Sequence, residues 1–88
     1  MDTEDTLFIF PCEFPVKAMG MASPEFDSLV VSLVRKHVPD LAEGAVKTRL
    51  SQGGRYMSVT ITIQARSRAQ LDSIYMELTE EKRVLMAL

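Results

Sequence analysis

Residue types that carry chemistry are scarce in this chain. Its 88 residues include one cysteine, Cys12, one histidine, His37, and no asparagine. A single cysteine cannot close a disulfide within the chain, which favours a reducing compartment. No apolar run reaches the roughly 18 residues of a membrane helix, and the acidic start MDTEDT lacks the basic head of a signal peptide. We therefore expect a cytoplasmic protein that has no membrane partner.

A large excess of either positive or negative charge is also lacking, since the formal net charge is −2 at pH 7. Such a balance argues against nucleic acid as a partner, because that role needs a strongly basic surface. The length suits one domain over residues 1–88, and the polar, acidic start predicts a flexible or loosely packed N-terminal arm over residues 1–10.

The longest regular pattern is a period of two over residues 56–65, YMSVTITIQA. Alternation of this kind predicts a strand with one apolar and one polar face. The apolar positions are Met57, Val59, Ile61, Ile63 and Ala65. Gly53 and Gly54 precede the run, so we expect a hairpin that joins it to a weaker strand over residues 45–52. In that strand Val46, Thr48 and Leu50 alternate with Lys47, Arg49 and Ser51.

Two amphipathic helices are expected to cover the apolar face of this sheet. The first follows Ser23 and Pro24, which suit the N-cap and the first helical position, and it stops before Pro39. Its apolar stripe is Phe26, Leu29, Val30, Leu33 and Val34. The second follows a capping box formed by Ser67 and Gln70. Its stripe is Leu71, Ile74, Tyr75 and Leu78.

Strands are also expected over residues 14–21 and 83–88, which completes the order β-α-β-β-α-β. Two βαβ-like units joined by a hairpin give a four-stranded antiparallel sheet with both helices on one face. Right-handed crossovers place the strands in the order 4-1-3-2. The sequence therefore predicts a ferredoxin-like α+β sandwich.

The chemistry that this fold often carries is missing. An acylphosphatase-type site needs an asparagine, which this chain lacks, and an arginine in the loop at residues 19–23, which contains none. A copper site needs two cysteines in a C-x-x-C, and this chain has one cysteine. RNA recognition needs several aromatic rings over the sheet centre, where this chain offers Tyr56 alone. His37 falls in the last turn of a helix, and Glu13 beside Cys12 would not activate the thiol. We expect no enzyme, no metal site and no cofactor.

One charge pattern stands out from this background. Residues 45–71 contain five basic residues and no acidic one. Strand alternation places two lysines and one arginine on the open face of the sheet, together with the polar side of the central strand. This candidate surface comprises Lys17, Met19, Lys47, Arg49, Tyr56, Ser58, Thr60 and Thr62. It is either a solvated hairpin whose charges prevent aggregation, or a binding surface for an acidic partner or an anionic small molecule.

Several motifs resemble the YbeD family of small bacterial proteins. They are Phe10-Pro11, FPVKAMG at 14–20, YMSVTITI at 56–63, Gln70-Leu71, Ile74-Tyr75-x-Glu77-Leu78 and VLMAL at 84–88. The resemblance implies a ferredoxin-like domain similar to the ACT domains that sense amino acids. It also implies a gene that neighbours lipoate-attachment genes. ACT ligands usually lie at the turn after strand 1, where Gly20 falls. Lys17 replaces the aspartate of the typical Asp-x-x-Gly pattern, which favours an anionic ligand.

Two functions follow as hypotheses. The first is a non-enzymatic regulatory or adaptor domain, linked to lipoate metabolism, that binds a protein partner or a second copy through the open sheet face or an edge. The second is a sensor that binds an anionic metabolite around Lys17, Gly20 and the start of the first helix.

Overall fold

The computed structural model describes residues 9–88, and its centre is a pair of long antiparallel strands. Strand β1 (Cys12–Met21) and strand β3 (Tyr56–Ala65) each have ten residues and pair along their whole length. The predicted central strand is thus confirmed residue for residue, while β1 begins two residues earlier than expected. Most of the predicted N-terminal arm, residues 1–8, lies outside the described residues.

Two shorter strands form the edges of the sheet. Strand β2 (Val46–Leu50) pairs with β3, and strand β4 (Val84–Ala87) pairs with β1, so the order is β2-β3-β1-β4. This is the predicted order, and the ferredoxin-like fold is confirmed. A 3-10 turn over Glu43–Ala45, which the sequence pattern did not reveal, leads into β2.

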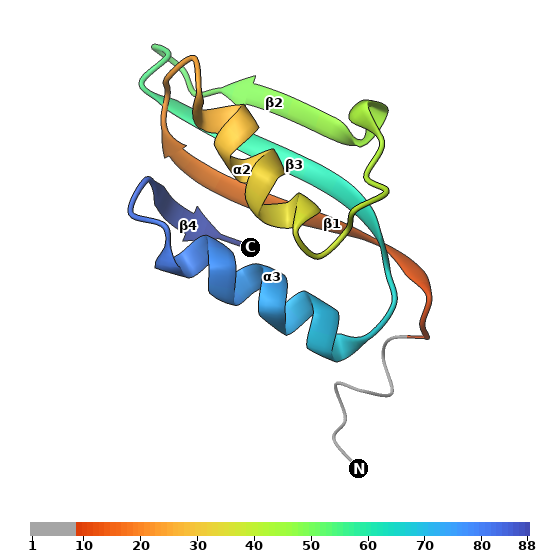
Figure 1. The fold of residues 1–88 in the computed structure, drawn as a ribbon. Helices are drawn as coiled ribbons and strands as arrows, with labels where there is room; N and C mark the ends of the chain where they lie inside the picture. Colours follow the sequence, from red (N-terminus) through yellow and green to blue (C-terminus); the bar gives the residue numbers. More distant parts are fainter. Residues whose placement is uncertain (1–8) are drawn as a thin grey trace.

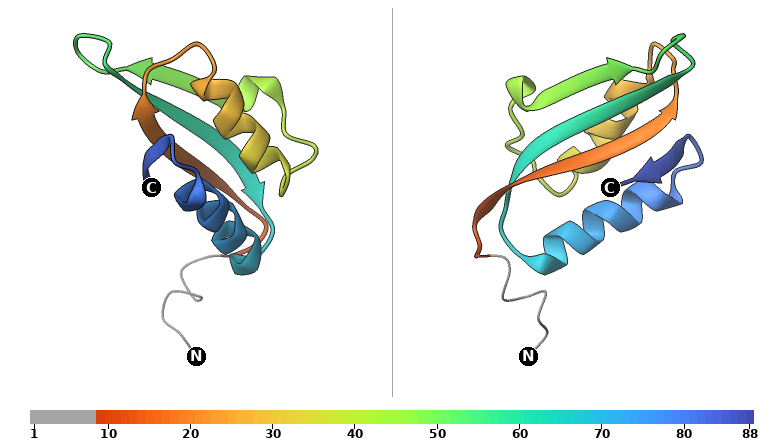
Figure 2. Two further views of the ribbon diagram at one scale, coloured as in Figure 1. Left: turned by 60° about the vertical axis from the view of Figure 1, so that its left-hand side comes forward. Right: turned by 180° about the vertical axis from the view of Figure 1, so that it is seen from behind.

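Both helices lie on the same face of the sheet (Figures 1 and 2). Helix α2 (Phe26–Arg35) packs against β1 and β3, and helix α3 (Arg68–Glu80) packs against β3 and β4. The core between the layers is apolar throughout. It contains Val16, Ala18, Phe26, Val30, Leu33, Val34, Val38, Val59, Ile61, Ile63, Ala65, Leu71, Ile74 and Leu78.

The helix layer does not extend over β2. Thr48 is exposed, and Leu50 keeps 55% of its surface in contact with solvent although it lies on the helix side of the sheet. Two helices span about two or three strands, because helices pack 8–10 Å apart and strands about 4.8 Å apart. The edge strand β2 therefore meets solvent on both faces.

The two helices begin differently. Ser67 caps α3 as predicted, since its Oγ accepts a hydrogen bond of 3.1 Å from the Gln70 N–H. The predicted Ser23 cap of α2 is wrong: the N-cap residue is Glu25, and no side chain bonds there. Ser23 and Pro24 instead belong to a turn in which the Ser23 carbonyl accepts from the Phe26 N–H at 3.3 Å. This extra turn brings Phe26 over Gly20 at the end of β1.

Candidate functional site

The face of the sheet opposite the helices is uncovered over residues 9–88 (Figure 2, right). Burial alternates along β3, where the helix-facing positions from Val59 to Ala65 are buried and the residues between them are partly or fully exposed. Strand β1 alternates in the same way from Val16 to Gly20. Side chains on this open face are therefore available to a partner.

Strand register brings two of the predicted lysines into one row. Lys17 pairs with Thr60, and Thr60 pairs on its other side with Lys47. Directly opposed residues project on the same face, so Thr60 lies between the two lysines on the open face. Both lysines are exposed. The row is a cationic band across three strands.

A second row runs beside the first. Met19 pairs with Ser58, and Ser58 pairs with Arg49. These side chains, with Tyr56 and Lys17, line a shallow hollow of about 250 Å³ near the hairpin. In the described part of the chain, no acidic side chain forms an ion pair with Lys17, Lys47 or Arg49. Lys17 and Arg49 thus line a small amphipathic depression, and Lys47 lies outside it on the same face.

Two of the predicted site residues stand apart from this cluster. Thr62 pairs with Pro15, beyond the end of β2, and lines a separate hollow of about 180 Å³ beside Arg66. Gly20 is buried and faces the helices, where a Cβ would lie 2.5 Å from Phe26 Cε1. Gly20 therefore serves packing, because only a hydrogen fits beneath the phenyl ring.

Apolar side chains on the same face were missed by the sequence reasoning. Met86 pairs with Met19, and the backbone of Leu88 exchanges two hydrogen bonds with Lys17, at 2.8 and 3.1 Å. Met21, Met86 and Leu88 each expose more than half of their surface. The apolar run VLMAL was visible in the sequence, but its register against β1 was not. The open face is accordingly basic toward β2 and apolar toward β4.

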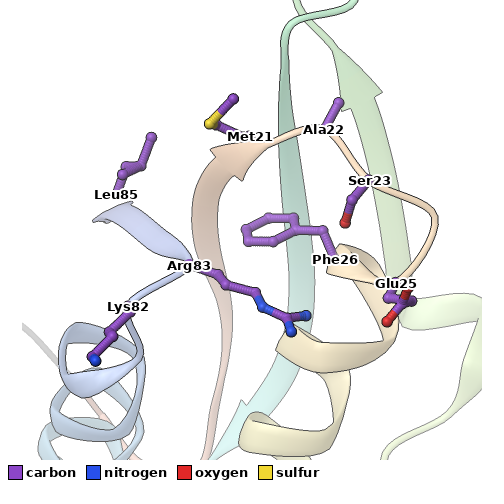
Figure 3. Close-up of a pocket in the computed structure, with 8 residues that line it drawn as sticks. All are labelled: Met21, Ala22, Ser23, Glu25, Phe26, Lys82, Arg83 and Leu85. Atoms are coloured by element: carbon purple, nitrogen blue, oxygen red, sulfur yellow. The ribbon is translucent and has the colours of Figure 1, made fainter.

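A larger cavity of about 430 Å³ lies at the turn from β1 into α2 (Figure 3). Phe26 forms its back wall, and Met21 and Leu85 stand at its rim. Arg83 reaches across the opening toward α2, whereas Lys82 projects from the loop before β4. Neither cation forms an ion pair within residues 9–88. The second hypothesis named Lys17, Gly20 and the start of the first helix; this cavity includes the start of α2, but neither Lys17 nor Gly20 lines it, and its cations come from the end of the chain.

Groups capable of acid–base or nucleophilic chemistry are dispersed. His37 Nε2 lies 3.6 Å from Glu77 Oε1, and Cys12 lies at the start of β1, where it packs against the core. Burial raises the pKa of Tyr75 above its ordinary 10.0, and the Tyr75 hydroxyl donates a 2.6 Å hydrogen bond to the Leu88 carbonyl. Within residues 9–88, no three metal-binding side chains come together. None of the described helices is long and apolar enough to cross a bilayer.

Comparisons with known proteins relate the chain to a family and to a solved fold. The family described as "Protein of unknown function (DUF493)" matches residues 5–88. A UPF0250 protein of Chromobacterium violaceum is 48% identical over 99% of this chain and 98% of its own length. UPF0250 protein NE1487 of Nitrosomonas europaea is 43% identical over 98% and 99%. The solution structure of protein HP0495 from H. pylori matches with a TM-score of 0.72 at 13% identity, over 99% of this chain and 91% of that one, which supports the fold.

Proposed function

Since the chain belongs to the DUF493 family of unknown function, we propose its activity from its own surface: it is a non-enzymatic adaptor or regulatory domain that binds a protein through the open sheet face. One observation carries this proposal. Lys17, Lys47 and Arg49 converge on an uncovered face without any acidic partner in the described residues.

The composition of the face favours an acidic protein partner. Cations at the β2 side provide electrostatic steering and register, which mainly raise the association rate and the specificity. Met19, Met86 and Leu88 supply apolar area that complexes bury, and methionine adapts to irregular partner surfaces. A simple solubility role explains the lysines and the arginine but not the exposed apolar side chains beside them.

Affinity capture from a native lysate, quantified by mass spectrometry, tests this function. The bait variant Lys47→Glu with Arg49→Glu should lose a partner that the wild-type protein captures. Its matched control is Lys36→Glu with Arg66→Glu, which changes the net charge equally but removes only surface ion pairs, to Glu77 and Asp40. Surface pairs contribute little to stability, so the control should fold and keep the partner. Equal recovery by both variants would contradict the proposal.

A second copy of the chain is the alternative partner for this face. Light scattering of the purified protein separates this case from binding of another protein. A dimer that dissociates in the Lys47→Glu, Arg49→Glu variant would place the interface on the open face, whereas a monomer at all concentrations leaves another protein as the partner.

The cavity at the β1–α2 turn supports a second candidate function, a sensor of an anionic metabolite. Phe26, Met21 and Leu85 offer an apolar wall, and Arg83 and Lys82 offer two cations without ion pairs among the described residues. Guanidinium groups bind carboxylates and phosphates in a bidentate manner. A small molecule with an apolar body and an anionic group fits this combination.

A thermal-shift screen against amino acids, nucleotides and lipoyl compounds tests the sensor. A ligand present at 100 times its Kd should add about 2.7 kcal/mol to the free energy of unfolding. The shift should disappear in Arg83→Ala and persist in Lys47→Glu with Arg49→Glu, because neither Lys47 nor Arg49 lines the cavity. A screen without any shift would count against a sensor.

A further inference from the structure

The hydrogen-bonding pattern of β2 leaves one side of this strand without partners among the described residues. The Ser51 N–H donates to the Tyr56 carbonyl at 2.8 Å, so Ser51 and Tyr56 form a hydrogen-bonded pair of the hairpin. Such pairs recur at every second residue of an antiparallel ladder. The backbone N–H and C=O groups of Arg49 and Lys47 therefore point toward β3 as well. The N–H and C=O groups of Thr48 and Leu50 must therefore point away from the sheet.

The stretch of β1 that extends past β4 is blocked in a way that β2 is not. The backbone of Lys17 is hydrogen-bonded to the backbone of Leu88. The backbone of Pro15, two residues earlier, faces the same edge, but Pro15 lies beyond the end of β4. Proline has no N–H, so this stretch of β1 offers no donor at that position. Within β2 no proline occurs. The chain thus blocks an added strand at β1 and leaves the edge of β2 able to pair.

The two sides of this edge differ in chemistry. Lys47 and Arg49 flank it on the open face, where neither has an ion pair among the described residues. On the helix side, Leu50 is exposed, and a hollow of about 330 Å³ lies between α2 and the start of β2. Its lining is mixed and comprises Val31, Val46, Asp27, Ser28, Ser32, Arg35 and Glu43. A strand laid here would find cations on one side, and on the other the apolar side chains of Leu50 and Val46 beside a mixed hollow.

A second copy of β2 paired about its central residue, Thr48, does not suit this edge. Antiparallel pairing about a two-fold axis at Thr48 would place Lys47 of each copy directly opposite Arg49 of the other. Like charges that face each other across strands are destabilising. The occupant must instead carry negative charge at alternate positions.

We propose that the edge of β2 binds an extended acidic segment of a partner protein, which adds to the sheet as a fifth strand. Acidic side chains at alternate positions meet Lys47 and Arg49, and the apolar side chains between them meet Leu50 and the hollow beside Val46. Backbone hydrogen bonds to Thr48 and Leu50 hold the segment, as in other cases of strand addition. This inference rests on the proposed function and specifies the form of the partner.

A synthetic seven-residue peptide in which glutamate alternates with valine serves as the probe. Titrated into the 15N-labelled protein, it should shift the amide resonances of β2 and slow hydrogen exchange at Thr48 and Leu50. The variant Thr48→Pro removes an outward N–H without touching the pairs with β3. Thr48→Pro should therefore bind the peptide about tenfold more weakly than Thr48→Val, which keeps this N–H.

A second measurement leaves the protein unchanged. The same peptide is also made with N-methyl groups at alternate amides, in each of the two phases. Only one phase blocks the amides that face β2, and this peptide should not bind. Absence of binding by the parent peptide, equal binding by Thr48→Pro and Thr48→Val, or binding of an all-glutamate peptide as tight as the parent would each overturn the inference. If the variant with Lys47→Glu and Arg49→Glu still loses its captured partner in that case, the open-face function stands and only the added strand fails.

Discussion

The phenyl ring of Phe26 lies directly over Gly20, so that a Cβ built on Gly20 would fall 2.5 Å from Phe26 Cε1. The carbonyl of Arg83 crowds the same point, and a backbone group cannot move aside as a flexible side chain can. The contact therefore joins the end of β1, the start of α2 and the loop before β4.

Gly20→Ala should lower the free energy of unfolding by about 1–3 kcal/mol, as overpacking does in a tight core. Urea denaturation followed by circular dichroism measures the change. Gly44→Ala is the matched control, since a Cβ on Gly44 would have open space around it and the stability of this variant should not fall. Equal effects of the two substitutions would argue against close packing at Gly20.

Ser67→Ala should destabilise the protein by about 1 kcal/mol, because it removes the side-chain acceptor for the Gln70 N–H at the start of α3. Ser23→Ala should have little effect, since the Ser23 side chain does not cap α2. Both variants can be compared in one series of denaturation curves. A large loss at Ser23 with none at Ser67 would reverse the assignment of the caps.

Tyr75→Phe should cost about 1 kcal/mol at neutral pH, because it removes the hydrogen bond to the Leu88 carbonyl that ties α3 to the end of the sheet. Its chemical denaturation midpoint should fall while the slope stays unchanged. An unaltered midpoint would mean that water replaces the Tyr75 hydroxyl without loss.

The stability contributed by Tyr75 should depend on pH in the alkaline range. Burial raises the pKa of the folded protein's Tyr75 above 10.0, so the neutral phenol is favoured in the folded state. Its contribution is complete below pH 10 and is lost as the pH rises through the folded-state pKa. The difference in melting temperature between the wild-type protein and Tyr75→Phe, measured from about pH 9 to about pH 11.5, should shrink at the upper end. A constant difference would contradict this linkage.

Binding of the acidic peptide to β2 should weaken with salt. Raising the ionic strength from about 0.1 to about 1 M shortens the Debye length from about 10 to about 3 Å. Fluorescence anisotropy with a labelled peptide should show this loss of affinity in the wild-type protein, and a flatter salt dependence after Lys47→Gln with Arg49→Gln. Arg66→Gln, at the far end of β3, should leave the salt dependence unchanged. A dependence equally steep in all three proteins would mean that Lys47 and Arg49 do not meet the peptide.

Local periodicity was sufficient to predict the fold, and the resemblance of several motifs predicted the family. The alternation from Tyr56 to Ala65 is a property of consecutive residues, and it correctly predicted the strand and its buried face. The stripes through Val30 and Ile74 predicted both helices in the same way, and the motifs that resemble the YbeD family are confirmed by the family match. The position of Lys17, Lys47 and Arg49 on one face follows from strand parity alone.

The tertiary structure decided which of these residues are neighbours. Register placed Thr60 between Lys17 and Lys47, the contact with Phe26 assigned Gly20 to packing, and the width of the helix layer left Leu50 exposed. Arg83 reached the cavity beside Phe26 because β4 pairs with β1. Secondary structure depends on neighbours along the chain, whereas register, coverage and cavities depend on contacts between distant segments. The sequence alone therefore determined the sheet and its faces, and only the folded chain determined the open edge of β2.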